Sequence, residues 1–244
     1  MKIYSHRFSE FSNDFNKWKE EFLAIKNQES NTQWKEGRSA WSLAWFMCKD
    51  NGEQRITEYV NEILLHLNDS IDHFDLGVIE HENKFDEFRG NGRIQDLAIW
   101  GKTKKGRRIY IAVEAKVDET FGKTISEELR DAEKYKNNGH PATKRIERIT
   151  RLRNDYLVGI DSDSLRYQLL YYLAGTIKEP FIQLDEDISI MLVLVFKTKL
   201  YDKQKGKSNK KDFDDFMKIV GEQREYGYDL SKIKPNTYAC YIEI

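Results

Sequence analysis

Two apolar runs separated by a short polar segment most strongly limit what this chain can fold into. Residues 94–100 and 108–116 consist mainly of Ile, Val, Ala and aromatic side chains, and the sequence GKTKKGR lies between them. Apolar runs of this length on either side of a glycine-containing polar segment are typical of a β-hairpin. The sequence therefore predicts two antiparallel strands in the interior of the protein.

The rest of the chain alternates between helical and strand-like patterns. Apolar spacing predicts helices over 39–48, about 54–67 and 164–177, and strands over 75–83, 188–197 and 237–244. Thr124-Ile125-Ser126-Glu127 has the spacing of a capping box, which predicts the start of a helix. A basic helix is expected over about 142–157. A lysine-rich loop is expected over 197–211, followed by a short helix over 213–220. This order favours one α/β domain over 1–244, with a helical part over about 1–70, a core over about 71–200 and a terminal helix and strand over about 201–244.

The apolar segments are too short for a membrane protein. The longest, residues 190–196, has seven residues, whereas a membrane-spanning helix needs about 20. The first ten residues contain no apolar signal-peptide core. Cys48 and Cys240 lie 192 positions apart and form no recognisable disulfide or metal-binding pattern, so we expect a cytoplasmic protein.

Charge is distributed unevenly along the chain although it nearly cancels. There are 40 basic and 41 acidic residues, and the basic ones cluster over 102–108, 144–153 and 197–211. Local positive charge can bind a polyanion even when the net charge is near zero. The candidates for contact with nucleic-acid phosphates are Lys144, Arg145, Arg148, Arg151 and Arg38. The alternative is that these side chains only solubilise the surface or form surface ion pairs.

Carboxylates in the predicted hairpin are the strongest candidates for chemistry. The chain contains no nucleophile elbow, phosphate-binding glycine loop or zinc-ligand spacing. Strand periodicity places Glu114 and Lys116 on one face, and antiparallel pairing brings Asp96 opposite Glu114. Two carboxylates beside a lysine form an oxygen-rich site that suits Mg²⁺, which would bind a phosphate oxygen and activate water. A structural salt bridge at a sheet edge is the alternative interpretation.

The helix predicted over 164–177 carries another pair of polar side chains. Gln168 and Tyr172 are four residues apart, so they share a face, and they lie among leucines on a helix that is apolar all round. A buried glutamine needs hydrogen-bond partners. It would either tie down a loop or position an active-site lysine or a phosphate.

Together these residues resemble the PD-(D/E)XK nuclease superfamily, which has the restriction-endonuclease-like fold. That family has an Asp on one strand, (D/E)xK on the next and, in many branches, QxxxY on a following helix. The chain is similar to a bacterial branch of the superfamily over about residues 34–200, in the segments Gly37-Arg38-Ser39-Ala40, Glu80-His81, 113–122 and 165–170. It departs from the usual pattern because Gln95 replaces the proline before Asp96 and 51 residues separate Lys116 from Gln168.

The resemblance implies a fold, a metal and a reaction. The fold would be a restriction-endonuclease-like mixed β-sheet flanked by helices, and the reaction hydrolysis of DNA phosphodiester bonds, with RNA as another candidate substrate. The implied site comprises Asp96 and Glu114 as Mg²⁺ ligands, Glu80 as a further acid at the metal, Lys116 as the catalytic lysine, and Gln168 and Tyr172 as supporting residues. Mn²⁺ would substitute for Mg²⁺, and a homodimer would suit cutting of both strands. A role in prokaryotic defence or restriction is expected; the alternative is a non-catalytic nucleic-acid-binding or protein-interaction module.

Overall fold

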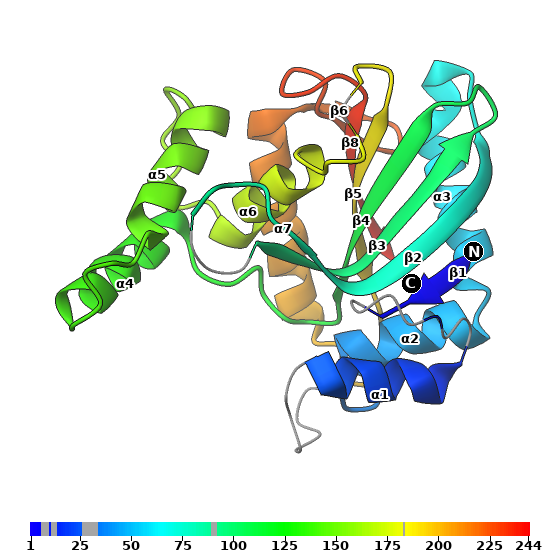
Figure 1. Ribbon diagram of the computed structural model, residues 1–244, viewed down its shortest axis with the longest axis horizontal. Coiled ribbons are helices and arrows are strands. Elements are labelled where there is room, and N and C mark those ends of the chain that lie inside the picture. Colours follow the sequence, from blue (N-terminus) through cyan, green and yellow to red (C-terminus); the bar gives the residue numbers. More distant parts are fainter. Residues whose placement is uncertain (6–9, 11–13, 26–33, 89–91, 183) are drawn as a thin grey trace.

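The computed structural model describes residues 1–5, 10, 14–25, 34–88, 92–182 and 184–244 (Figure 1). The strands within these residues are β1 (Lys2–Tyr4), β2 (Ile71–Asn83), β3 (Arg93–Thr103), β4 (Arg108–Lys116), β5 (Ile188–Val195), β6 (Glu222–Arg224), β7 (Gly227–Asp229) and β8 (Thr237–Glu243). The helices are α1 (Phe15–Ile25), α2 (Ser39–Lys49), α3 (Gly52–Leu64), α4 (Ile125–Asn137), α5 (Arg145–Tyr156), α6 (Tyr167–Ile177) and α7 (Lys203–Val220), and the short 3-10 helix Leu65–Leu67 follows α3.

All the described strands lie in one mixed sheet with the order β1-β2-β3-β4-β5-β8-β7-β6. Strands β2, β3 and β4 pair antiparallel, whereas β5 runs parallel to both of its neighbours, β4 and β8. The return from β4 to β5 passes through α4, α5 and α6, and the return from β5 to β8 passes through α7. The predicted α/β class, with a mixed sheet flanked by helices, is therefore confirmed. β1 and β8 join this same sheet from the two ends of the chain.

The hairpin predicted from the two apolar runs is formed by β3 and β4. Its pairing starts at Leu97 and Val113 and continues to a turn over residues 104–107. Val113 belongs to the apolar core on one face of the sheet, and Ala112 to the core on the other. Because side chains alternate along a strand, Glu114 is expected on the same face as Ala112.

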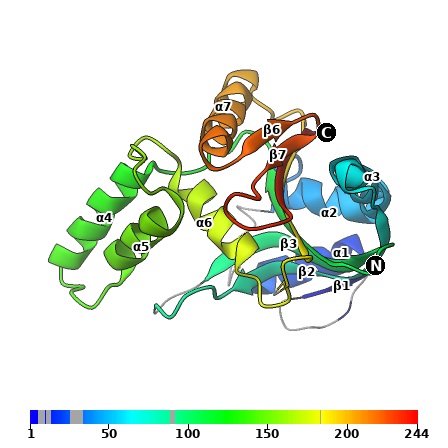
Figure 2. The same cartoon turned by 90° about the horizontal axis from the view of Figure 1, so that it is seen from above.

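The helices cover the two faces of the sheet as separate groups (Figures 1 and 2). Helices α1, α2 and α3 pack on the face that carries Val113, and Phe46 of α2 is part of that core. Helices α6 and α7 pack on the face that carries Ala112, where Leu169 of α6 is fully buried. β5 lies near the centre of the sheet and is buried along its whole length, which explains its uninterrupted apolar sequence.

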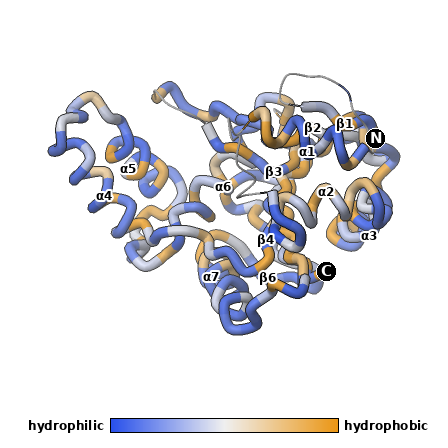
Figure 3. The backbone as a smooth tube through the Cα atoms, turned by 90° about the horizontal axis from the view of Figure 1, so that it is seen from below, coloured by the Kyte–Doolittle hydropathy of each residue, from blue (hydrophilic) through white to orange (hydrophobic). Residues whose placement is uncertain are grey.

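Helices α4 and α5 form a pair that projects from the side of the sheet (Figures 1 and 2). Along both helices hydrophilic positions alternate with hydrophobic ones (Figure 3), as expected for helices that bury one side. The predicted capping box is confirmed at the start of α4. The Thr124 hydroxyl accepts a hydrogen bond of 3.3 Å from the Glu127 N–H, and the Glu127 carboxylate accepts one of 2.8 Å from the Thr124 N–H.

Helices α7 and α6 begin at other residues than the sequence predicts. The loop expected over 197–211 is wrong from Lys203 onward, because α7 begins there with its first turn capped by the Asp202 carboxylate. Helix α6 begins at Tyr167, three residues later than expected, because the backbone oxygens of Asp163 and Leu165 accept hydrogen bonds from the first turn of α4 instead. Helix α1, strand β1 and the β6–β7 hairpin were not predicted from the sequence.

Candidate active site

The end of the β3–β4 hairpin brings the predicted acidic residues together. Beyond the pair formed by Leu97 and Val113, the next positions of the two strands are Asp96 and Glu114. An Asp96 carboxylate oxygen accepts a hydrogen bond of 2.7 Å from the backbone N–H of Ala115. The prediction that antiparallel pairing places Asp96 beside Glu114 is therefore confirmed.

Lys116 and Gln168 hold one oxygen of the Glu114 carboxylate. The Lys116 Nζ lies 2.9 Å from Glu114 Oε1, and the Gln168 side-chain amide donates to the same oxygen at 2.7 Å. Gln168 Oε1 in turn accepts a hydrogen bond of 3.4 Å from Lys116. Of the roles considered for Gln168, this geometry matches the positioning of the lysine.

Arg93, which the sequence analysis missed, holds the other oxygen of Glu114. Its Nη2 forms an ion pair with Glu114 Oε2, and its Cζ lies 5.1 Å from the centroid of the Tyr172 ring. Burial alone would raise the pKa of Glu114, but the positive charges of Arg93 and Lys116 outweigh burial and lower that pKa. Glu114 is therefore ionised although it is almost fully buried.

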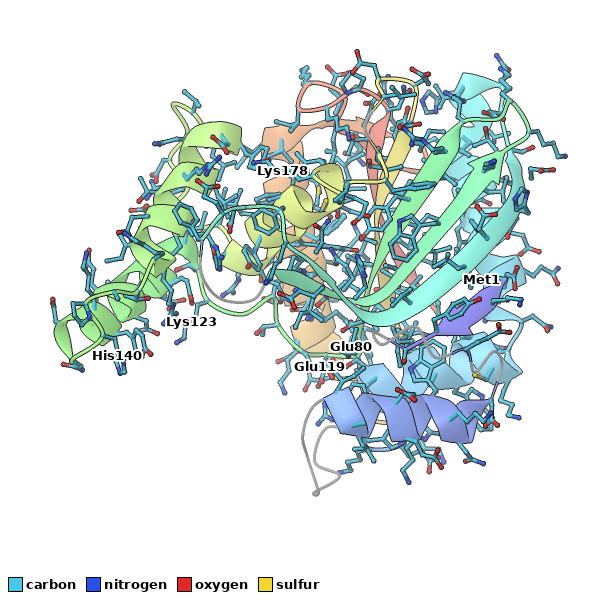
Figure 4. The ribbon with its side chains drawn as sticks, in the orientation of Figure 1. Met1, Glu80, Glu119, Lys123, His140 and Lys178 are labelled. Atoms are coloured by element: carbon cyan, nitrogen blue, oxygen red, sulfur yellow. The ribbon has the colours of Figure 1, made fainter. Side chains whose placement is uncertain are left out.

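Glu80 joins the site from β2 at a point where the strand is irregular. Its φ is 49°, in the left-handed region that residues other than glycine rarely adopt, and only 6% of its surface is exposed. Val78 packs in the core beneath α6, and Asn83, five residues later, also bonds to α6, although a regular strand would place them on opposite faces. The side chains of β2 change from one face of the sheet to the other near Glu80. Glu80 and Asp96, which lie between two paired positions of β2 and β3, are not themselves paired. Figure 4 shows Glu80 at the same end of the sheet as Glu119, which follows β4.

This irregularity explains why the sequence did not reveal Arg93. Regular alternation puts Arg93 and Asp96 on opposite faces of β3, because they are three positions apart. In the structure the guanidinium of Arg93 nevertheless lies on the α6 side, against Tyr172. The only signal in the sequence is a basic residue at the edge of an apolar run.

Asp96 is an acid with a strongly perturbed pKa. Burial raises this pKa, and the negative charges of Glu114 and Glu80 raise it further, to about 8. The hydrogen bond from Ala115 and the charge of Lys116 oppose this rise without cancelling it. Asp96 therefore holds a proton at neutral pH, because the site concentrates more negative charge than its cations neutralise.

The donor atoms of this cluster fit a hard divalent cation. Glu80, Asp96 and Glu114 supply carboxylate oxygens, which Mg²⁺ prefers, and the raised pKa of Asp96 marks an excess of negative charge that a cation would relieve. In the arrangement observed, no three His, Cys, Asp or Glu side chains of the described residues lie close enough together to hold a metal ion. One reason is that donors already bind both oxygens of Glu114.

Tyr172 lies behind the site and does not line it. The side chain is fully buried, and its hydroxyl donates to the backbone oxygen of Ala112 at 2.5 Å and approaches that of Leu192 at 3.3 Å. These bonds join α6 to the neighbouring strands β4 and β5. The supporting role of Tyr172 is therefore to fix the helix and to provide the ring against which Arg93 packs.

The five predicted phosphate-binding residues all have acidic partners in the structure. Arg38 pairs with Asp118, Lys144 with Glu147, Arg145 with Glu128, Arg148 with Asp86, and Arg151 with Glu87. Arg148 binds both oxygens of Asp86, at 2.8 and 3.0 Å, and its side chain is only 12% exposed. Arg148 thus anchors the segment after β2, and the structure does not support a phosphate contact by this residue.

The start of α7 lies at the end of β4 that carries the candidate site. Lys205 Nζ is 3.6 Å from Asp118, which follows the last residue of β4 by two positions. Lys203 and Lys207 are also exposed in the first two turns of α7. Cations are unfavourable at a helix N-terminus because the helix dipole is positive there. The carboxylates of Asp202, which caps the helix, and of Asp118, beside Lys205, offset part of this electrostatic cost.

The fold and the site define an α/β protein whose mixed sheet presents Glu114 and Lys116 to the covering helix α6, with Asp96 on the neighbouring strand. The chain belongs to the family described as Domain of unknown function (DUF6946), whose family model matches residues 12–243. Comparisons with curated proteins and with solved structures gave no match. Among the described helices, none combines the length and the apolar character needed to cross a membrane.

Proposed function

We propose that this protein is a Mg²⁺-dependent nuclease that hydrolyses phosphodiester bonds in DNA. The observation that carries the proposal is the buried Lys116, held between Glu114 and Gln168 beside a second acid, Asp96. A structural salt bridge between Lys116 and Glu114 needs no further carboxylate, yet Asp96 lies close enough for Glu114 to raise its pKa. Titratable side chains with strongly shifted pKa values are concentrated at functional sites.

The side chains of the site have distinct roles in this proposal. Glu80, Asp96 and Glu114 would hold Mg²⁺, which neutralises phosphate charge and favours deprotonation of water. The Lys116 ammonium has three N–H groups; it binds Glu114 and Gln168 and lies 5.3 Å from the centroid of the Phe121 ring. In the proposed nuclease, the remaining N–H would donate to water or to a phosphate oxygen. Lys116 thereby orients the attacking water or stabilises the charge that develops on the phosphate. Gln168 keeps the ammonium in place.

The phosphate backbone of the substrate is proposed to bind at the start of α7. Lys203, Lys205 and Lys207 are exposed there, and the half-exposed Arg38 lies near by because it shares Asp118 with Lys205. Contacts of this kind release counterions, so binding weakens steeply as salt rises. In this proposal the protein acts in the cytoplasm, in restriction-like defence. RNA is another candidate substrate, and a homodimer would suit the cutting of both DNA strands.

A second candidate function is a non-catalytic nucleic-acid-binding module. The ion pair between Arg93 and Glu114 favours this candidate, because an arginine that neutralises Glu114 weakens the attraction of that carboxylate for a cation. The two candidates differ in one measurable property. Only the nuclease converts its nucleic acid to shorter products when a divalent cation is present.

The test is cleavage of supercoiled plasmid, single-stranded DNA and single-stranded RNA in Mg²⁺ and in Mn²⁺. Wild type is compared with Glu114→Gln, which keeps the size of the side chain, and with Glu243→Gln, a control at an exposed position. Cleavage by wild type and by Glu243→Gln but not by Glu114→Gln supports the nuclease. Salt-sensitive retardation of DNA without cleavage identifies the binding module instead. Equal cleavage by all three proteins would refute this site.

A further inference from the structure

Arg93 is buried between β3 and α6, beside Glu114. Its side chain is 11% exposed, its Nη2 contacts Glu114 Oε2, and its guanidinium packs against the Tyr172 ring at 5.1 Å. The ion pair with Glu114 is therefore the contact by which Arg93 acts on the site.

Helix α6 is shaped to admit the Arg93 side chain. Gly175 faces the stem of Arg93, and a Cβ atom at position 175 would lie 2.7 Å from Arg93 Cβ and 2.8 Å from Arg93 Cγ. Real Cβ atoms essentially never approach other atoms so closely. Glycine is also one of the poorest helix formers, yet Gly175 lies inside α6. The packing of Arg93 gives a physical reason for a glycine at this place.

The hydrogen bonds of Glu114 divide unequally between its two oxygens. Oε1 binds two donors, Lys116 and Gln168, whereas Oε2 binds Arg93. A carboxylate oxygen has two lone pairs, so Oε1 is saturated by its two donors. Oε2 is the oxygen that keeps acceptor capacity toward a further ligand, and Arg93 is the residue that sets its direction.

We infer that Arg93 is the positioning residue of this site: it fixes the Glu114 carboxylate so that Oε2 faces the cation, and Gly175 provides the space that this requires. The inference rests on the proposed nuclease function. Because Arg93 is a positive charge beside a ligand oxygen, it also weakens the affinity of the site for the cation. Its removal therefore has two separable effects, a slower reaction and tighter cation binding.

The experiment compares wild type with Arg93→Met, Arg93→Lys and Gly175→Ala. The matched control is Arg108→Met, because Arg108 of β4 also pairs with a buried carboxylate, Asp187, and packs 5.2 Å from the ring of Phe181. Arg108 lies at the opposite end of β4 from Glu114. Initial rates are measured against DNA concentration and against Mn²⁺ concentration, and the fraction of folded protein is measured in parallel.

For Arg93→Met, kcat is expected to fall, KM for DNA to stay unchanged, and the Mn²⁺ concentration for half-maximal rate to fall about tenfold. Gly175→Ala is expected to change the rate in the same direction, although alanine is the better helix former. Arg93→Lys restores part of the rate, and Arg108→Met leaves the Mn²⁺ requirement unchanged. An unchanged Mn²⁺ requirement in Arg93→Met, with loss of rate only in proportion to folded protein, overturns the inference.

A stability measurement separates failure of this inference from failure of the nuclease proposal. If wild type cleaves no nucleic acid, the nuclease proposal fails, and unfolding of Arg93→Met, Glu114→Gln and the double variant still tests the positioning of Glu114. Non-additive effects of the two substitutions show that Arg93 holds Glu114. Additive effects overturn the inference whatever the activity of the protein.

Discussion

Asp96 gives the site a pH dependence that can be measured without any assay of activity. In the folded protein its pKa is raised from its ordinary value of 3.8 to about 8, by burial and by the charges of Glu114 and Glu80. Between about pH 4 and pH 8 the folded state therefore binds one more proton than the unfolded state. The free energy of unfolding falls as pH rises through this window, and the loss is complete above the folded pKa.

The size of this effect follows from the shift. One pKa unit corresponds to about 1.4 kcal/mol, so one extra bound proton in the folded state gives a slope of about 1.4 kcal/mol per pH unit between the two pKa values. Asp96→Asn keeps an oxygen that can accept the hydrogen bond from Ala115 but carries no charge. Relative to wild type, this variant should therefore gain about 4 kcal/mol between pH 5 and pH 8.

The assay is urea denaturation of both proteins in EDTA at pH values from 5 to 9. Asp161→Asn, a change at an exposed loop position, controls for the general effect of removing one carboxylate. The difference in unfolding free energy between Asp96→Asn and wild type should grow with pH and level off above about pH 8. A difference that is constant from pH 5 to pH 9 would show that Asp96 titrates normally and that the three carboxylates do not interact as described.

Three further predictions follow from the structure. Lys116→Met should lower the cleavage rate about 100-fold to 1000-fold with little change in DNA affinity, measured by initial rates and by filter binding, because Lys116 acts on the developing charge; unchanged rates would contradict its role. Changing Lys203, Lys205 and Lys207 together to Gln should weaken DNA binding and reduce the slope of log affinity against log salt by about 3, measured by fluorescence anisotropy; an unchanged slope would place the DNA elsewhere. Thr124→Ala should lower the unfolding free energy by about 1 kcal/mol in urea denaturation, because it removes the capping box of α4; no loss would mean that tertiary packing alone holds that helix.

Features that depend on neighbouring residues were predictable from the sequence. The capping box at Thr124 needs only the three residues that follow it, and it is present in the structure. The β3–β4 hairpin needs only two apolar runs and a short turn, and its register brings Asp96 beside Glu114. Strand alternation correctly placed Glu114 and Lys116 on one face of the sheet, where both contact Gln168 of α6.

Features that depend on distant partners were not predictable. Arg148 was a candidate for phosphate contact because it lies in a basic segment, but its partner Asp86 is 62 positions away and binds Nε and Nη2 of its guanidinium with both carboxylate oxygens. The lysines at the start of α7 were expected in a loop, whereas the helix capped by Asp202 places them at the end of β4.

By itself the sequence determined the α/β class, the central hairpin and the grouping of Asp96, Glu114 and Lys116, because the repeat of a strand and the length of a turn are local properties. Only the tertiary structure decided how Glu114 is held. The break in alternation at Glu80 turns Arg93 toward α6, and Gly175, from another part of the chain, leaves the space into which Arg93 fits. Such a contact depends on the relative position of two surfaces, and that position is set by the packing of the whole core.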